Sequence, residues 1–135
     1  MKVVINTCFG GFGLSYAGMM KYAELKGIKF YAFTYKTPGD HNTYRYADSD
    51  AEECTIHYTS KPLTEDGKYE DGSYVSYMDF DRDDPVLVKI VEELGEKAND
   101  CHSKLKIVEI PDGTDYYIHD YDGNESIHEK HRSWS

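Results

Sequence analysis

Hydrophobic patterning along the first 35 residues predicts a strand, a helix and a second strand. The β-branched run at 2–8 indicates a buried strand that stops at a glycine cluster. Apolar residues at helical spacing over 14–26, with Ser15 as N-cap and Gly27 as C-cap, predict a helix. The aromatic run 28–35 predicts a strand that a right-handed crossover places parallel to the first. These elements together predict a βαβ unit.

Patterning in the last 60 residues predicts a second helix and an antiparallel meander. Asp84 as N-cap and Pro85 at the first helical position begin a helix that extends to about residue 98 and carries one apolar stripe. Strands are expected at 73–80 and 104–110, and a hairpin at 116–121 and 126–131 around the turn 122–124. The expected fold is a single α/β domain over 1–135, with a mixed sheet, an N-terminal βαβ unit and a C-terminal antiparallel meander.

The segment 36–72 differs from the rest because turn signals dominate it. We expect an acidic, loop-rich insertion with one short strand at 54–58. The segment 37–84 contains 13 acidic and 4 basic residues, whereas residues 1–36 contain five lysines and one glutamate. The whole chain has a formal net charge of -10, which opposes binding to a phosphate backbone. We therefore expect no direct nucleic-acid binding.

Composition also limits the setting of the protein. The longest apolar run is only a few residues, and the N-terminus lacks the hydrophobic segment of a secretion signal, so we expect a soluble, cytoplasmic protein without membrane contact. Three cysteines, Cys8, Cys54 and Cys101, are an odd number without CxxC spacing, which favours free thiols over a disulfide framework.

The clearest candidate site is the glycine-rich loop between the first strand and the first helix. Backbone N–H groups and a helix N-terminus in this position can hold an anion. The loop lacks the third glycine of the dinucleotide fingerprint, because Tyr16 occupies that place, and it lacks the Gly-Lys-Ser/Thr of Walker A. It also resembles the phosphate loop of low-molecular-weight tyrosine phosphatases, but Leu14 replaces the arginine, which disfavours phosphatase chemistry at Cys8.

The residues expected to bind a ligand belong to this loop and to the C-terminal hairpin. They are Thr7, Cys8, Gly10, Gly11, Phe12, Gly13, Ser15, Tyr121 and Arg132. The alternative is that the glycines only allow the strand and the helix to pack closely.

No metal or cofactor is expected from the spacing of possible ligands. His128 and His131 would point to opposite faces of a strand. Asp79, Asp81 and Asp83 begin like a calcium loop, but the turn glycine and the bidentate glutamate are missing. We therefore expect no metal site.

Both ends of the chain carry distinctive motifs: VINTCFGGFGLS at 4–15, VEIPDG at 108–113, and EKHRSW at 129–134. Together with RDDPVLV at 82–88, they resemble a family of small proteins encoded by bacteriophages and prophages. The resemblance covers roughly the first 35 and the last 55 residues. It implies a bacterial cytoplasm during infection as the setting, and it implies no reaction.

Three functions follow from these features. The leading hypothesis is a phage accessory, anti-defence protein that sequesters a phosphorylated nucleotide-type small molecule at the glycine-rich loop, without catalysis. The alternative is an acidic nucleic-acid mimic, or another inhibitor that binds a host protein through segment 37–84. The third is an enzyme that uses Cys8 as its nucleophile.

The C-terminus carries the chain's single tryptophan, Trp134. Burial of an indole contributes about 2–3 kcal/mol, so we expect Trp134 to dock on the domain or, in a homo-oligomer, on a second subunit. Arg132 would then share its face.

Overall fold

The computed structural model describes residues 1–37, 43–47, 55–76 and 80–130. Two helices and three antiparallel sheets make up this part of the chain, which confirms the α/β class. The elements are β1 (Lys2–Asn6), α1 (Tyr16–Lys26), β2 (Tyr31–Tyr35), β3 (Tyr44–Tyr46), β4 (His57–Thr59), α2 (Pro85–Leu94), the 3-10 helix η3 (Gly95–Ala98), β5 (Leu105–Glu109), β6 (Tyr116–Tyr121) and β7 (Asn124–Glu129).

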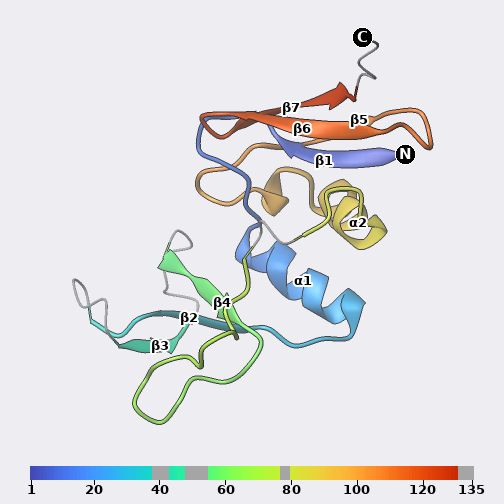
Figure 1. The fold of residues 1–135 in the computed structure, drawn as a ribbon. Helices are drawn as coiled ribbons and strands as arrows, with labels where there is room; N and C mark the ends of the chain where they lie inside the picture. The colour runs from blue at the N-terminus through green and yellow to red at the C-terminus, as the bar shows by residue number, and fades with distance from the viewer. Residues whose placement is uncertain (38–42, 48–54, 77–79, 131–135) are drawn as a thin grey trace.

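The sheets pair in an order that differs from the expected one. Strand β1 pairs antiparallel with β5, from Lys2 opposite Glu109 to Asn6 opposite Leu105. The strand, helix, strand order at the N-terminus is present, but β2 lies in another sheet, with the order β3-β2-β4. The expected parallel pairing of β1 with β2 therefore does not form. Helix α1 instead carries the chain away from β1 to the opposite end of the molecule (Figure 1).

The two helices lie between the sheets and build the core. Both expected N-caps are confirmed, since the side chain of Ser15 accepts a hydrogen bond from the Gly18 N–H and that of Asp84 from the Val86 N–H. The apolar stripe of α2 is buried against α1 and β1, with Leu87 and Ile90 fully covered. Each such side chain contributes about 1.5–3 kcal/mol, so α2 is the main source of apolar stabilisation in this layer.

Asp84 also joins the two helices by polar contacts. Its carboxylate forms an ion pair with Lys26 at 2.7 Å and accepts a hydrogen bond from the Tyr22 hydroxyl at 3.2 Å. Burial opposes ionisation, but the hydrogen bonds from Lys26 and Val86 outweigh it and hold the pKa of Asp84 below its usual value. The N-cap of α2 therefore stays charged and fixes the end of α1.

The segment expected to be a loop-rich insertion supplies two strands of the three-stranded sheet. Strands β3 and β4 flank β2, and β4 covers 57–59 rather than the expected 54–58. One cluster of aromatic rings covers this sheet, formed by Phe33, Tyr35, Tyr44, His57, Tyr69 and Tyr74. The tyrosines of the insertion therefore stabilise a small sheet of their own. The expected hairpin of β6 and β7 forms, but its turn is 122–123 and β7 covers 124–129 rather than 126–131.

A buried ion pair connects the C-terminal hairpin to the rest of the fold. The guanidinium of Arg82 donates to both carboxylate oxygens of Glu125 at 2.6 and 2.9 Å, and the two side chains are only 10% and 4% exposed. The same carboxylate accepts the Asn6 backbone N–H at 2.8 Å. Arg82 also covers the ring of Phe12, with 3.6 Å from its central carbon to the ring centroid. This pair thus links β7, β1 and the glycine-rich loop.

Glu125→Gln should lower the free energy of unfolding by about 3–5 kcal/mol, because it leaves the buried Arg82 guanidinium without a counter-charge. Urea unfolding followed by circular dichroism measures the change. Glu70→Gln is the matched control, since it removes an exposed pair with Lys61 and should change stability by less than about 0.5 kcal/mol. Equal effects of the two substitutions would contradict the central role of the buried pair.

Candidate functional site

The glycine-rich loop, residues 7–15, is held against a turn formed by residues 99–104. The thiol of Cys8 donates to the His102 carbonyl at 2.9 Å, and the hydroxyl of Ser103 donates to the Gly13 carbonyl at 2.8 Å. Backbone hydrogen bonds join Thr7 N–H to the Lys104 carbonyl and Ser15 N–H to the Ala98 carbonyl. The loop is therefore fixed near both of its ends, while Phe9 and Gly10 in its middle are exposed to solvent.

Two glycines of the loop approach this turn closely: Gly10 is required because it meets backbone atoms, whereas Gly13 meets the side chain of Asp100. A Cβ atom on Gly10 would overlap the carbonyl oxygen of His102, and one on Gly13 would overlap the carboxylate of Asp100. On the other side, a Cβ on Gly123 of the hairpin turn would lie 2.6 Å from the Gly11 nitrogen. Close packing, the alternative considered for the glycines, accounts for Gly10 and Gly13.

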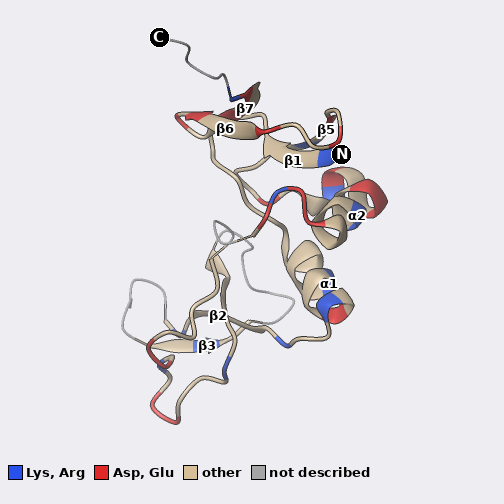
Figure 2. Cartoon of the chain, turned by 45° about the vertical axis from the view of Figure 1, so that its right-hand side comes forward, with Lys and Arg blue, Asp and Glu red and all other residues tan. Residues whose placement is uncertain are grey.

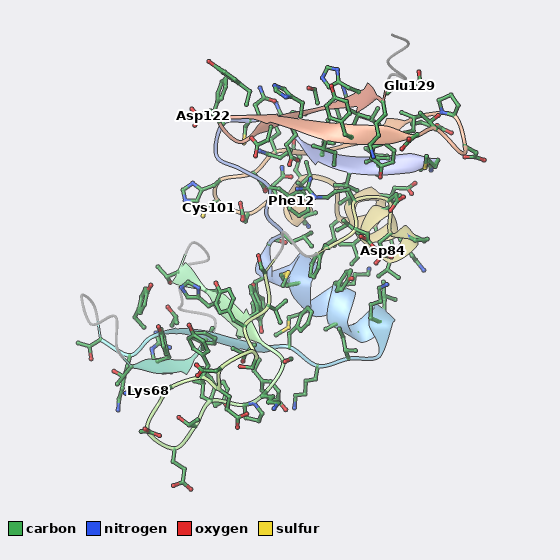
Figure 3. All side chains as sticks on the ribbon, viewed as in Figure 1. Phe12, Lys68, Asp84, Cys101, Asp122 and Glu129 are labelled. Carbon is green, nitrogen blue, oxygen red and sulfur yellow. The ribbon has the colours of Figure 1, made fainter. Side chains whose placement is uncertain are left out.

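Residues 10–12 of the loop form one wall of a cavity of about 270 Å³. Four segments line it: 10–12 from the loop, 56–58 from around β4, 74–76, and 100–102 from the turn. Figure 3 shows the labelled Phe12 and Cys101 between the upper strands and the lower three-stranded sheet. The cavity thus lies where the two halves of the fold meet.

His57 and Tyr74 form a neutral hydrogen-bonded pair in this cavity. The Nδ1 atom of His57 lies 2.9 Å from the hydroxyl oxygen of Tyr74. Burial lowers the pKa of His57, so its ring is neutral at pH 7. Burial and the nearby phenols of the aromatic cluster raise the pKa of Tyr74, so its hydroxyl keeps its proton. The pair can therefore offer hydrogen bonds and ring faces without a net charge.

The opposite wall contributes one carboxylate and a second imidazole. Asp100 Oδ1 accepts the His102 backbone N–H at 2.8 Å, which stabilises the turn. None of the described lining residues is a lysine or an arginine. The lining therefore suits a ligand with an aromatic ring and little negative charge.

The structure brings together only some of the residues expected to bind. Gly10, Gly11 and Phe12 line the cavity, whereas Thr7, Cys8, Gly13, Ser15 and Tyr121 are not among its lining residues. Ser15 is 4% exposed, and its hydroxyl already accepts from Gly18 and donates to the Lys97 carbonyl. Tyr121 is 70% exposed and contacts Phe9 edge to face at the hairpin end. Arg132 and Trp134 lie outside the described residues.

Most of the cavity's polar groups were not expected from the sequence. His57 and Tyr74 come from the segment on either side of β4, and Asp100 and His102 from the turn before β5. They carry no recognisable spacing, because 24 or more positions separate the turn from the other segments. Only the strands expected at 54–58 and 73–80 marked part of this region.

The cysteines differ in state. Cys101 is disulfide-bonded, which corrects the expectation of free thiols, while Cys8 is a free thiol. The hydrogen-bond partners of the Cys8 sulfur are two oxygens, Asn6 Oδ1 at 3.3 Å and the carbonyl of His102. No imidazole nitrogen contacts Cys8 within the described part of the chain. This arrangement gives no support to a cysteine nucleophile activated by a base.

Acidic residues of the described ranges are spread over the surface. Figure 2 shows them in the loop after β4, around α2 and in the β6–β7 hairpin rather than on one face. Glu70 is paired with Lys61, and Glu65 and Asp66 lie beside Lys36 and Arg45. The acidic run at 48–53 lies outside the described residues. The nucleic-acid mimic stays a prediction that no contact in the described part favours.

Residues 1–37, 43–47, 55–76 and 80–130 hold no cluster of three or more His, Cys, Asp or Glu side chains that fits a metal ion. None of the helices in these ranges combines the length and apolar content of a bilayer crossing. Neither a protein-family model, nor a curated protein, nor a solved structure matches the chain. The resemblance to phage-encoded proteins therefore stays a prediction.

Proton titration of His57 should report its burial. The pKa of His57 is lower in the folded chain than its unfolded value of about 6.5. The neutral ring therefore makes its full contribution to the free energy of unfolding above pH 6.5, and this contribution is lost as pH decreases through the folded pKa. NMR titration of the ring protons measures this value directly, with assignment by the His57→Gln variant. A midpoint at or above 6.5 would contradict the buried, neutral ring.

Gly10→Ala should destabilise the fold by about 1–3 kcal/mol and loosen the turn 99–104, because the new methyl group must displace the His102 carbonyl. Hydrogen exchange should increase at residues 100–104. Gly113→Ala is the control: its φ of 79° makes alanine unfavourable by about 1 kcal/mol, but open space surrounds it. Exchange at 100–104 should then be unchanged, and an equal response to both variants would show that the close approach is unimportant.

Proposed function

We propose that this chain is a binding protein for a small nucleotide-type ligand, held in the cavity between the glycine-rich loop and the three-stranded sheet. One observation carries the proposal: Gly10, Gly11 and Phe12 of the loop line the same cavity as His57, Tyr74 and His102. Ligand sites are typically concave, largely apolar and provided with a few convergent polar groups. This cavity is concave and has convergent polar groups, and its lining is polar as well as apolar.

The lining matches the two ends of a nucleotide. The half-exposed ring of Tyr74 and the adjacent ring of His57 offer faces against which a base stacks. The backbone N–H groups of Gly10, Gly11 and Phe12 take no hydrogen-bond partner within the described part of the chain, so they are available as donors. Together with the ring of His102, these N–H groups can donate hydrogen bonds to the phosphate oxygens at the other end of the nucleotide.

The charges of the lining side chains limit which nucleotides the cavity can bind. One carboxylate, Asp100, and no lysine or arginine among the described lining residues disfavour a di- or triphosphate, which carries several negative charges. A phosphodiester carries a single charge and can be held by neutral donors. A cyclic nucleotide, with one phosphodiester charge, or a cyclic dinucleotide, with two, therefore fits this cavity better than a nucleoside triphosphate.

The role proposed for the protein is sequestration without chemistry. The neutral His57–Tyr74 pair and the absence of a base beside Cys8 in the described ranges support binding rather than turnover. The proposed setting, the cytoplasm of an infected bacterium, and the anti-defence role rest on the resemblance to phage-encoded proteins expected from the sequence motifs.

Calorimetric titration with a panel of cyclic dinucleotides, ADP-ribose derivatives, nucleoside triphosphates and inorganic phosphate tests the proposal. We expect a phosphodiester ligand to bind and the triphosphates and inorganic phosphate to bind at least tenfold more weakly. His102→Ala should weaken binding about tenfold, because loss of one hydrogen bond costs about 1–1.5 kcal/mol.

His119→Ala is the matched control, since it removes an exposed imidazole from β6, outside the cavity. It should leave the dissociation constant unchanged. Failure of every phosphorylated ligand in the panel to bind, or equal effects of His102→Ala and His119→Ala, would overturn the proposed site.

A further inference from the structure

The hairpin of β6 and β7 packs on the fold with one face and points to solvent with the other. Figure 1 shows it on the far side of β1 from the helices. Residues directly opposite each other in an antiparallel pair share a face, as Tyr117 and His128 do. The inward face carries Glu125, which is buried against Arg82. The outward residues form the outer hairpin face: Tyr117, His119, Tyr121, Asn124, Ser126 and His128.

The outer hairpin face is aromatic and lacks formal charge. It contains no carboxylate, ammonium or guanidinium group, although 30% of the residues in the chain are charged. Tyr117 is 46% exposed and Tyr121 is 70% exposed. Phe9 of the glycine-rich loop, itself 63% exposed, extends the aromatic surface, because its ring contacts that of Tyr121 at 6.4 Å between centroids. Exposed aromatic side chains that cluster in this way mark a surface that binds a partner.

The rings of this face hold one another in place. Tyr117 and His128 stack with 5.5 Å between their ring centroids, and the ring of His119 meets that of His128 edge to face at 5.8 Å. The Nε2 atom of His128 lies 2.8 Å from the hydroxyl oxygen of Ser126. Side chains that are already ordered lose less conformational entropy when a partner binds.

Carboxylates surround the outer hairpin face. Asp122 lies in the turn and Glu129 is the last residue of β7, at opposite ends of the hairpin (Figure 3). Asp120, Asp122 and Glu129 are exposed, and none of them forms an ion pair within the described part of the chain. Lys130 at the base is already paired with Asp115 at 3.5 Å. In a chain with a net charge of -10, this rim attracts cationic groups and repels anionic ones.

We propose that the outer hairpin face docks an arginine-bearing segment of a basic partner protein. A guanidinium group stacks flat on an aromatic ring, and its N–H groups bind a nearby carboxylate. The exposed rings of the face supply the stacking surfaces, and the carboxylates of its rim supply the acceptors.

Charge favours this occupant over a second copy of the chain. A second copy brings the same rim of carboxylates and the same net charge of -10, so two such faces repel each other. A nucleic acid is repelled in the same way. None of the residues of the outer hairpin face lines the cavity at the glycine-rich loop, so docking here does not depend on the proposed nucleotide ligand.

NMR titration of the isotope-labelled full chain with a short capped peptide of alternating glycine and arginine tests the docking surface. We expect the backbone signals of residues 117–121 and 124–128 to shift. A peptide in which lysine replaces arginine should bind about threefold more weakly, because an ammonium group does not stack flat on a ring. Unshifted hairpin signals at millimolar arginine peptide would contradict the proposal.

Exchange of one tyrosine tests the aromatic part without a change of charge. Tyr117→Ser should weaken binding of the arginine peptide about two- to fivefold, as expected for a cation–π contact at an exposed site, whereas Tyr117→Phe should keep the affinity. Tyr46→Ser is the matched control, because Tyr46 is 50% exposed and lies in β3 of another sheet. It should leave the affinity unchanged. Equal affinities of folded Tyr117→Ser and wild type would show that the rings do not bind the peptide.

Removal of one carboxylate tests the rim. Asp122→Asn should weaken binding of the arginine peptide about twofold and keep the turn, because asparagine tolerates the φ of 52° at this position. Asp71→Asn removes the same charge from the exposed loop after β4 and should have no effect. Equal effects of the two substitutions would indicate attraction by net charge alone and would overturn the docking surface. A dimer in sedimentation velocity that Tyr117→Ser dissociates would assign the face to a second copy, with the same consequence.

Discussion

The buried pair of Arg82 and Glu125 is the interaction on which the arrangement of this fold depends. Removing two charges from water costs several kcal/mol per ion, which only good geometry and additional hydrogen bonds offset. Here the guanidinium binds both carboxylate oxygens, and the Asn6 N–H supplies a further donor. Each ion therefore has a partner in the other layer, and neither layer can move without exposing an unpaired charge. The position of the β6–β7 hairpin follows from that constraint.

Asn6 extends the same polar network to the glycine-rich loop. Its side-chain amide donates to the carbonyls of Cys8 and Gly123 at 2.7 and 2.6 Å, and its Oδ1 accepts from the Lys104 N–H at 2.8 Å. A fully buried amide with all of these partners fixes the positions of three segments around the end of β1. The loop geometry is thus imposed from the strand side by Asn6 and from the helix side by Ser15.

Local signals in the sequence predict local structure well in this chain. The N-caps Ser15 and Asp84, the proline at the start of α2 and the hairpin turn are each decided by residues a few positions apart, and all are present. The partner of β1 could not be predicted in the same way, because β5 begins about 100 residues later and both β2 and β5 offer suitable apolar patterns. The parallel pairing was wrong for that reason.

For the candidate site, too, the sequence predicted features set by neighbouring residues but not contacts between distant segments. A glycine-rich turn after a strand marked the correct loop, but the pattern could not reveal that Gly10 and Gly13 pack closely against the turn 99–104. The other half of the cavity comes from β4 and from that turn, whose residues meet only because two sheets pack through the helices. The state of Cys101 was likewise hidden, since an odd number of cysteines says nothing about which of them lie close together.

The glycine-rich loop therefore meets two structural requirements: it packs closely against the turn 99–104, and it passes beside the cavity. Gly10 approaches the turn so closely that a side chain is excluded, while Gly11, at a φ of 97° and with open space where a Cβ would lie, directs the chain past the cavity. In a phosphate loop of the usual kind, the N–H groups of the loop and of the helix N-terminus face the phosphate. Here the Ser15 N–H bonds the Ala98 carbonyl, and the Ser15 hydroxyl accepts the Gly18 N–H at that end of α1. The donors that stay available are those of residues 10–12, which lie beside the aromatic wall. In the proposed binding mode, the ligand therefore contacts the seam between the two halves of the molecule rather than the helix terminus.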